Sequence, residues 1–438
     1  MPEPELKREL GLRDVTLFAT TCVTATRWIP AAAHSGPGSV TIWLLTAILF
    51  MAPLAVSVGA LAAKYPGSGG LYTWTRNDFG PWHGFLCFFV YWVGIAVWFP
   101  SAAIFYMSAG LSALPAPLAN LTADRAAMLL VAVAAIWIAL GSNLVGLKVG
   151  KWTENIGGSA TWVVTILLVV TAALVWRTRG SATPIDIVPK WSWSTVNLWS
   201  NLAYGMSGLE MVAMMGAEIH NPLRTLPRGG WIASGFAVVF YTSTTTAMLV
   251  LLQPQKISEM TGFAQAGHAA AALLHAAWLA PVLALLVLAT GMGQIGGLGT
   301  SVSRLPFAAG ADRMLPAAFA KIHPRWGTPH VSILGLGVVA TFLLAVYQLG
   351  DTMRAAYDEL VSLMVITGFL PYLYIFGSAW KAGTRISAVS GWLVTLLTLV
   401  CAVVPTAEAA NLWLYEGKLL GGTAAVIAVA RWLYRRSL

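Results

Sequence analysis

Arg27 and Glu210 are ionisable side chains that lie within long apolar segments of this 438-residue sequence. An ionised group in hydrocarbon costs at least about 2.5–3.5 kcal/mol, so such groups generally face an aqueous pathway or a partner. A guanidinium can hold a carboxylate through two hydrogen bonds, and a buried carboxylic acid can gain and lose a proton. The two residues are therefore candidates for binding an anionic group and for responding to protons. The alternative is a structural ion pair between them.

Both candidates adjoin short sequences that weaken a helix. The sequence VTATRWIP occupies residues 23–30, and YGMSGLE occupies residues 204–210. Unwound backbone at membrane depth is tolerated where it lines a cavity or is covered by protein. We therefore predict breaks at 25–28 and 205–208 that line a binding site. Glycine and proline that serve only close helix packing are the alternative.

The remaining ionisable side chains predict neither an enzyme nor a metal centre. An intramembrane enzyme needs a nucleophile with its base or a metal cluster, and no such group is evident. Only His268 and His275 stand at a helical spacing, two turns apart, and the other histidines are scattered. We predict no catalytic residue, no metal and no cofactor.

Several further residues are assigned structural roles. The three cysteines show no metal or redox spacing and are expected to be small core residues. Four acids lie near predicted helix ends, where solvation satisfies a charge easily. The cysteines are Cys22, Cys87 and Cys401, and the acids are Glu154, Glu218, Asp358 and Glu359.

The composition requires elements that cross a membrane. The chain is 58% hydrophobic and 10% charged, and its mean hydropathy is +0.72. Such a sequence cannot form a soluble surface, so we predict an all-α polytopic membrane protein in a lipid bilayer. Apolar segments near the roughly 20 residues that cross a bilayer number about twelve. They lie at 15–34, 40–63, 84–112, 126–147, 155–176, 196–219, 231–252, 270–309, 331–349, 356–379, 386–405 and 419–434. The segment at 270–309 exceeds one span, so we expect a short amphipathic helix before the span proper.

The charge distribution predicts the orientation. The formal net charge is +9, which in a soluble protein would suggest nucleic acid. With Arg27 set aside within a span, 18 of the other Lys and Arg residues fall on the side of the N-terminus and 7 on the opposite side. This asymmetry satisfies the positive-inside rule. We therefore predict no nucleic-acid partner, a location in the plasma (inner) membrane and cytoplasmic termini.

The two predicted breaks also suggest an internal repeat. Each break falls in the first span of a set of five, the pattern of transporters built from inverted repeats that bind substrate at the breaks. The expected parts are a cytoplasmic N-terminus (1–13), repeats at 14–178 and 196–379, and two final spans within 386–434.

Three separated motifs resemble the amino acid–polyamine–organocation (APC) superfamily of transporters. KYPGSGGLYTWTRNDFGPWHGF at 64–85 matches a Pro-x-x-Gly-Gly-x-Tyr and Phe-Gly-Pro pattern after the second helix. GLE at 208–210 with GAEIHNPLRTLPR at 216–228 resembles the segment around the sixth helix. SR at 303–304, ADRMLP at 311–316, HP at 323–324 and TP at 328–329 are similar to the pattern after the eighth helix. The likeness covers about residues 10–380.

The sequence at the first break favours one branch of this superfamily. Many members carry Gly-Ser-Gly where this chain has Ala25, Thr26 and Arg27. Thr26 to Pro30 instead resembles the Leu-Arg-x-x-Pro segment of the glutamate/GABA antiporters, which exchange an acidic amino acid for its decarboxylated product. Leu298 stands where some relatives place a tryptophan that stacks on substrate.

The resemblance implies a LeuT-like fold and transport of an amino acid or related amine by alternating access. Backbone N–H groups after each break and Arg27 would hold a carboxylate, and open carbonyls with Ser207 would receive the amine. The expected substrate site comprises Ala25, Thr26, Arg27, Trp28, Tyr204, Gly205, Met206, Ser207 and Gly208. Tyr204, Trp98 and Glu210 are the expected gating or proton-sensing residues.

The coupling mode remains open between two readings. Exchange is the leading one, and a proton-coupled symporter in which Glu210 titrates is the second. A sodium site that uses Thr300 or Ser301 is a further possibility. An intramembrane enzyme is the alternative of a different class. The sequence predicts no oligomeric state.

Overall fold

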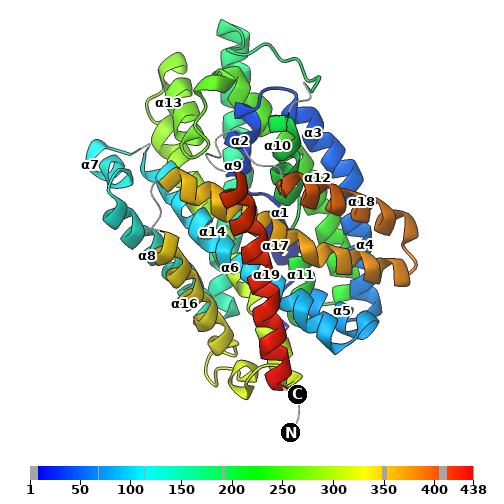
Figure 1. The fold of residues 1–438 in the computed structure, drawn as a ribbon. Helices are drawn as coiled ribbons and strands as arrows, with labels where there is room; N and C mark the ends of the chain where they lie inside the picture. The colour runs from blue at the N-terminus through cyan, green and yellow to red at the C-terminus, as the bar shows by residue number, and fades with distance from the viewer. Residues whose placement is uncertain are drawn as a thin grey trace.

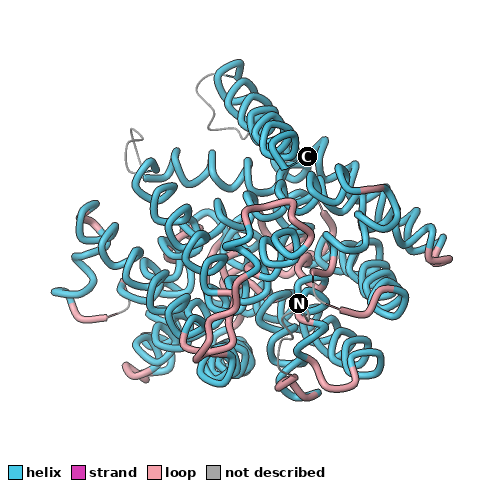
Figure 2. The backbone as a smooth tube through the Cα atoms, turned by 90° about the horizontal axis from the view of Figure 1, so that it is seen from below, coloured by secondary structure: helices cyan, strands magenta, loops and turns pink. Residues whose placement is uncertain are grey.

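The computed structural model describes residues 8–67, 69–112, 114–189, 193–347, 353–403 and 412–437. Within these ranges the chain is helical with connecting loops and has no strand (Figures 1 and 2). One isolated parallel bridge joins Leu10 to Ile219. The expected all-α class is therefore confirmed for the described residues.

The helices that matter for the site are given with their bounds. The first half contains α1 (Leu12–Val23), α2 (Trp28–His34), α3 (Ser39–Thr46), α4 (Ala52–Lys64), α5 (Leu71–Phe79), α6 (Pro81–Leu111), α7 (Ala116–Ala119), α8 (Arg125–Leu144) and α9 (Leu147–Arg179). The second contains α10 (Trp193–Gly205), α11 (Glu210–Met214), a 3₁₀ turn η3 (Gly216–Glu218), α12 (Pro222–Leu251), α13 (Gly262–Leu274), α14 (Leu279–Val302) and α15 (Arg304–Ala311). The last are α16 (His330–Tyr347), α17 (Met353–Lys381), α18 (Arg385–Val403) and α19 (Leu412–Ser437).

Eight helical segments of the described residues are long and apolar enough to cross a membrane. They support the membrane prediction, and α16 is a shorter apolar helix beside them. The eight are Ser39–Lys64, Pro81–Leu111, Arg125–Leu144, Lys148–Arg179, Pro222–Leu251, Leu279–Ala311, Leu363–Lys381 and Arg385–Val403.

The first and sixth predicted spans are interrupted, as expected. Residues 24–27 separate α1 from α2, and residues 206–209 separate α10 from α11. The breaks follow from local sequence, because Gly208 adopts a φ of 106°, which only glycine reaches without strain. The prediction of breaks near 25–28 and 205–208 is confirmed.

The long apolar segment at 270–309 also divides as predicted. α13 precedes the span. α13 ends at His275, whose φ of 53° makes a left-handed turn. α14 then begins at Leu279 and leads into α15.

One end of the bundle holds both the start of α1 and the C-terminal end of α19 (Figure 1). We call it the termini end. Tyr434 of α19 packs on the rings of Trp82 and Phe85 of α6, at centroid distances of 5.2 and 5.7 Å. Figure 2 looks toward this part of the molecule from below.

All three motifs that carry the family resemblance meet at the termini end. Tyr72 donates a hydrogen bond of 2.7 Å to Asp312, and Arg76 lies 3.3 Å from the same carboxylate. Burial and the Asp312 carboxylate raise the pKa of the Tyr72 hydroxyl, which therefore remains a donor. Arg304 forms a buried pair with Glu218. The motifs thus serve to join segments that are far apart in sequence.

The expectation that Glu154 and Glu218 are solvated at helix ends is wrong. Glu154 is 2% exposed and Glu218 is 3% exposed. α9 begins at Leu147, eight residues before the predicted span, so Glu154 lies inside a packed helix. The side chains of Asp358 and Glu359 lie outside the described residues.

Candidate functional site

A cavity lies between the two breaks and is lined from several helices. Its volume is about 20 Å³. Seven predicted residues line it, namely Ala25, Trp28, Trp98, Tyr204, Gly205, Ser207 and Gly208. Residues that the sequence did not assign to substrate also line it, among them Cys22, Tyr91, Gln294, Leu298, Gly368 and Tyr372. The structure therefore brings most of the predicted site together around one small cavity.

Four predicted residues do not line this cavity. Met206 is fully buried, and its N–H donates to carbonyls of α10. Thr26 is fully buried, and its hydroxyl has no hydrogen-bond partner among the described residues. Arg27 and Glu210 lie behind the cavity wall, each with its own set of contacts.

Arg27 is a buried cation held mainly by neutral groups. It is 1% exposed, and its Nη1 donates 2.8 Å to the hydroxyl of Ser101. Its guanidinium lies 4.4 Å from the ring centroid of Trp28 and 5.9 Å from that of Trp98, within cation–π range. Its Nε has no hydrogen-bond partner, and no carboxylate lies within ion-pair distance among the described side chains. A buried guanidinium normally has an anionic partner, so this one has unused binding capacity.

Glu210 begins α11 directly after the second break. It is fully buried, and its Oε1 accepts a hydrogen bond from the hydroxyl of Tyr91 on α6. Its Oε2 has no hydrogen-bond partner in the described part of the chain. Glu210 therefore links the break to α6 and does not pair with Arg27, so the structural ion pair considered from sequence is absent between these two residues.

Tyr204 forms an aromatic wall with its neighbours. Its ring meets Trp28 edge-on at a centroid distance of 5.9 Å and lies 6.1 Å from Phe369. Ser207 donates 2.7 Å to the carbonyl of Tyr204, which holds the hydroxyl at the break. This placement suits a side chain that covers one side of the cavity.

Tyr241 of α12 joins the two breaks, and sequence reasoning did not identify it. Its hydroxyl accepts 2.9 Å from the N–H of Ala25 and donates 2.7 Å to the carbonyl of Gly205. Its ring stacks on Trp43 at 4.0 Å. One side chain thus satisfies a backbone group from each interrupted helix. No sequence motif marks it, because the contacts join residues 216 and 36 positions apart.

Gln294 of α14 and Tyr372 of α17 satisfy further open backbone groups. The Gln294 amide donates to the carbonyls of Thr21 and Thr24, at 3.1 and 3.3 Å, and Tyr106 donates to its oxygen. The N–H of Gly208 donates 3.1 Å to the hydroxyl of Tyr372. Several backbone groups expected to meet the substrate are therefore bonded to side chains that also line the cavity.

Replacing Gly208 by alanine should prevent the two breaks from approaching. A Cβ at this position would lie 2.7 Å from the carbonyl oxygen of Cys22, and the φ of 106° is strained for any L side chain. Such backbone strain costs about 1–3 kcal/mol before the steric clash is added. We expect a clear drop in the thermal unfolding temperature of the purified protein.

Gly235→Ala is the matched control, because no atom lies within 4 Å of its added Cβ and it sits inside α12. Its unfolding temperature should hold or rise, since alanine favours a helix over glycine. Equal effects of the two substitutions would contradict a close contact at Gly208.

Tyr241→Phe should weaken the join between the breaks. The substitution keeps the ring and leaves the N–H of Ala25 and the carbonyl of Gly205 without their partner. An unsatisfied buried group costs about 1–3 kcal/mol. Thermal unfolding should show this loss. Tyr374→Phe removes one partly buried hydroxyl near His83 and should cost less. A Tyr241→Phe protein as stable as this control would show that the bridge contributes little.

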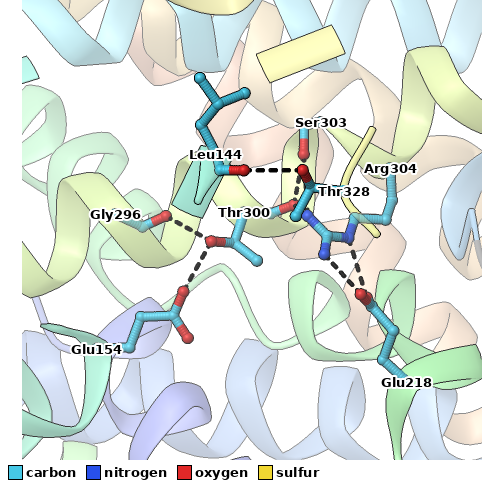
Figure 3. Close-up of polar contacts among 8 residues, drawn as sticks. All are labelled: Leu144, Glu154, Glu218, Gly296, Thr300, Ser303, Arg304 and Thr328. Atoms are coloured by element: carbon cyan, nitrogen blue, oxygen red, sulfur yellow. Dashed lines mark hydrogen bonds and ion pairs between the residues drawn. The ribbon is translucent and has the colours of Figure 1, made fainter. Parts of the chain in front are cut away.

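A second polar cluster is buried at the termini end (Figure 3). Arg304 binds Glu218 through two contacts, Nε to Oε2 at 3.0 Å and Nη2 to Oε1 at 2.6 Å. Its Nη1 donates 2.6 Å to the carbonyl of Thr300. The hydroxyl of Thr300 lies 2.7 Å from Oε1 of Glu154. The cluster therefore runs continuously from α9 through α14 and α15 to η3.

A mostly helical bundle with membrane-length segments and a polar-lined cavity between two broken helices has the construction of a membrane transport protein. The chain belongs to the amino acid permease family, which matches residues 10–420. This membership makes it a transporter of the APC superfamily and excludes the intramembrane enzyme.

Similar proteins agree with this assignment. An uncharacterized transporter of Legionella pneumophila is 24% identical over 98% of this chain and 97% of its own length. The serine/threonine exchanger SteT of Bacillus subtilis is 26% identical over 75% of this chain and 74% of its own. The branched-chain amino acid permease BcaP of the same species is 23% identical over 83% and 80%.

Proposed function

We propose that the protein is a secondary transporter that exchanges amino acids or related amines across the membrane by alternating access. The observation that carries the proposal is Arg27, a fully buried cation beside the cavity with an unused donor and no acidic partner among the described side chains. A substrate carboxylate would supply the missing anion through a two-point contact. The similarity to a serine/threonine exchanger supports exchange as the mode.

The proposed substrate site combines both breaks. Arg27, with the backbone at Ala25 and Thr26, would hold the carboxylate, while Trp28 closes that side. The second break, which consists of Gly205, Met206, Ser207 and Gly208, would face the rest of the substrate. The side-chain amide of Gln294 donates to the carbonyls of Thr21 and Thr24, so a substrate amine would displace this amide to reach them.

Three side chains are proposed to gate the site. Tyr204 and Trp98 line the cavity and would cover the substrate. Glu210 joins the second break to Tyr91 of α6, so a change in its protonation would alter the contact between a moving helix and its support. A proton-coupled symporter is the second candidate, favoured by this buried carboxylate with one unpartnered oxygen.

The overall architecture is proposed to be LeuT-like. In this arrangement α1 with α2 and α10 with α11 each form one interrupted span, and residues 14–178 and 196–379 form inverted repeats, with α18 and α19 as the two further spans. About twelve spans result. The Arg27-x-x-Pro30 segment supports the glutamate/GABA antiporter branch within the superfamily.

The charge asymmetry supports a cytoplasmic termini end in the plasma (inner) membrane. Lys or Arg residues occur in the regions 1–13, 64–76 and 380–385, in the loop after α15 and at the C-terminal end of α19. A protease or thiol label applied to sealed cells would test this orientation.

Counterflow in proteoliposomes tests the function. Vesicles are loaded with one amino acid or decarboxylated amine at a time, and one labelled candidate is supplied outside. Transient accumulation of label that depends on the internal compound identifies an exchanged pair. Uptake that needs a proton gradient and no internal compound would favour the symporter. A panel in which no amino acid or amine moves would reject the proposal.

A further inference from the structure

Glu154 is a buried acid that the proposed substrate site does not use. It is 2% exposed, and it forms no ion pair with any described side chain. Its Oε1 lies 2.7 Å from the hydroxyl of Thr300, in the interface between α9 and α14 (Figure 3). A carboxylate buried without a cation is costly, so such a group is commonly neutral.

The hydrogen count at Thr300 also favours a neutral acid. The Thr300 hydroxyl lies 2.7 Å from Glu154 Oε1 and 3.0 Å from the carbonyl oxygen of Gly296. A hydroxyl has one hydrogen, and neither a carboxylate nor a carbonyl can donate. With Glu154 ionised, only one of the two short contacts holds a hydrogen. With Glu154 protonated, its O–H donates to Thr300 and Thr300 donates to Gly296, so both contacts are hydrogen bonds.

The charged groups around Glu154 leave no free cation to neutralise it. Arg304 of α15 faces it across Thr300 but is bonded in two-point fashion to Glu218 of η3. Asp14 of α1 also faces it, and Lys151 of α9 lies 4.0 Å from Asp14. The other Asp, Glu, Lys, Arg and His side chains on the helices packed against α9 are exposed, namely Arg13 on α1, Arg125 on α8, Arg224 and Arg228 on α12, and His268 on α13.

We propose that Glu154 is a proton-binding site whose occupancy controls the opening of the termini end. When the proton leaves, two buried carboxylates, Glu154 and Glu218, compete for the single guanidinium of Arg304. The two-point pair with Glu218 weakens, and with it the contact that joins α15 to η3. The proton returns to the same carboxylate when this end closes.

The same cluster reaches the first broken helix. The backbone carbonyl of Glu218 accepts from the N–H groups of Glu9 and Leu10, at 2.9 and 3.0 Å. Weakening the Arg304–Glu218 pair therefore releases the segments that precede α1 and follow α11 together. A role for Glu154 in proton-coupled transport rests on the proposed transport function. The protonation of Glu154 is independent of that function.

Infrared difference spectroscopy tests the proton directly. The full-chain protein in lipid nanodiscs is titrated from acidic to alkaline pH while the carboxylic-acid C=O band is followed. We expect a band that disappears as pH rises, is absent in Glu154→Gln, and persists in the matched variant Glu210→Gln. A set of titrating bands that is the same in Glu154→Gln as in the original protein, or no titrating band at all, would overturn the proposal.

Thr300→Val provides a second variant if Glu154→Gln does not fold. Valine keeps the shape and removes the hydroxyl, so the C=O band should shift position as its hydrogen bond is lost. A band at an unchanged position would show that the acid is not Glu154.

Hydrogen exchange tests the link to opening. After correction for intrinsic rates, amides of residues 214–220 should exchange at least tenfold faster at alkaline pH in the original protein and show no such change in Glu154→Gln. If amide exchange depends on pH equally in the original protein and in Glu154→Gln, the proposed coupling between Glu154 and the opening of the termini end is overturned. Neither measurement uses a substrate, so a failed counterflow panel with a titrating Glu154 rejects the transport proposal and leaves the proton site standing.

Discussion

Arg27→Lys should weaken transport of a carboxylate-bearing substrate by about 30-fold or more, nearly as much as Arg27→Ala. A lysine retains the charge but cannot reproduce the planar two-point contact of a guanidinium. Removing one partner of a buried, hydrogen-bonded charge pair costs about 2–5 kcal/mol, and each 1.4 kcal/mol corresponds to tenfold. The measurement is the concentration dependence of counterflow for the exchanged pair identified by the panel.

The comparison between substrates separates binding from structural support. A decarboxylated amine lacks the group that Arg27 is proposed to hold, so Arg27→Lys should affect its transport much less. Arg385→Lys is the matched control, because Arg385 is exposed at the start of α18. Equal losses for the acid and the amine would show that Arg27 only supports the fold through Ser101 and the two tryptophans.

Arg304→Met should destabilise the protein by about 3–5 kcal/mol, the usual cost of leaving one member of a buried pair without its partner. Arg304 and Glu218 have side-chain exposures of only 2% and 4%. Glu218→Gln should have a similar effect, since it removes the charge that holds the guanidinium. Thermal unfolding of the purified protein in nanodiscs measures both.

The double variant Glu218→Gln/Arg304→Met should recover much of the lost stability, because no uncompensated charge remains. Arg76→Gln is the control for a more exposed pair. Arg76 lies 3.3 Å from Asp312 with side-chain exposures of 37% and 28%, and exposed pairs contribute about 1 kcal/mol or less. Strictly additive losses in the double variant would mean that the pair is not an energetic unit.

The sequence predicted the features that depend on local backbone chemistry. The breaks at 25–28 and 205–208 follow from residues that cannot sustain a helix, and they were found where expected. The eight membrane-length segments follow from apolar length alone. Arg27 and Glu210 were recognisable as unusual because a charge in an apolar segment needs an explanation wherever it lies.

The features that sequence reasoning missed depend on contacts between distant segments. Tyr241 and Gln294 look like ordinary helix residues until folding places them against open backbone groups of α1 and α10. Glu154 was assigned to a helix end because hydropathy marks where the apolar segment starts and not where the helix does. The helix continues past it, and α14 covers it.

Three backbone hydrogen bonds join residues 9–10 to residues 218–220. Two are accepted by the carbonyl of Glu218, and the third runs from the N–H of His220 to the carbonyl of Leu10. These bonds do not depend on side-chain identity, so substitutions leave them largely intact. We therefore expect the segment that leads into α1 and the segment that follows α11 to move together. A fluorescent dye attached near residue 9 would report the motion of both segments, which gives single-molecule experiments a labelling position that does not line the cavity.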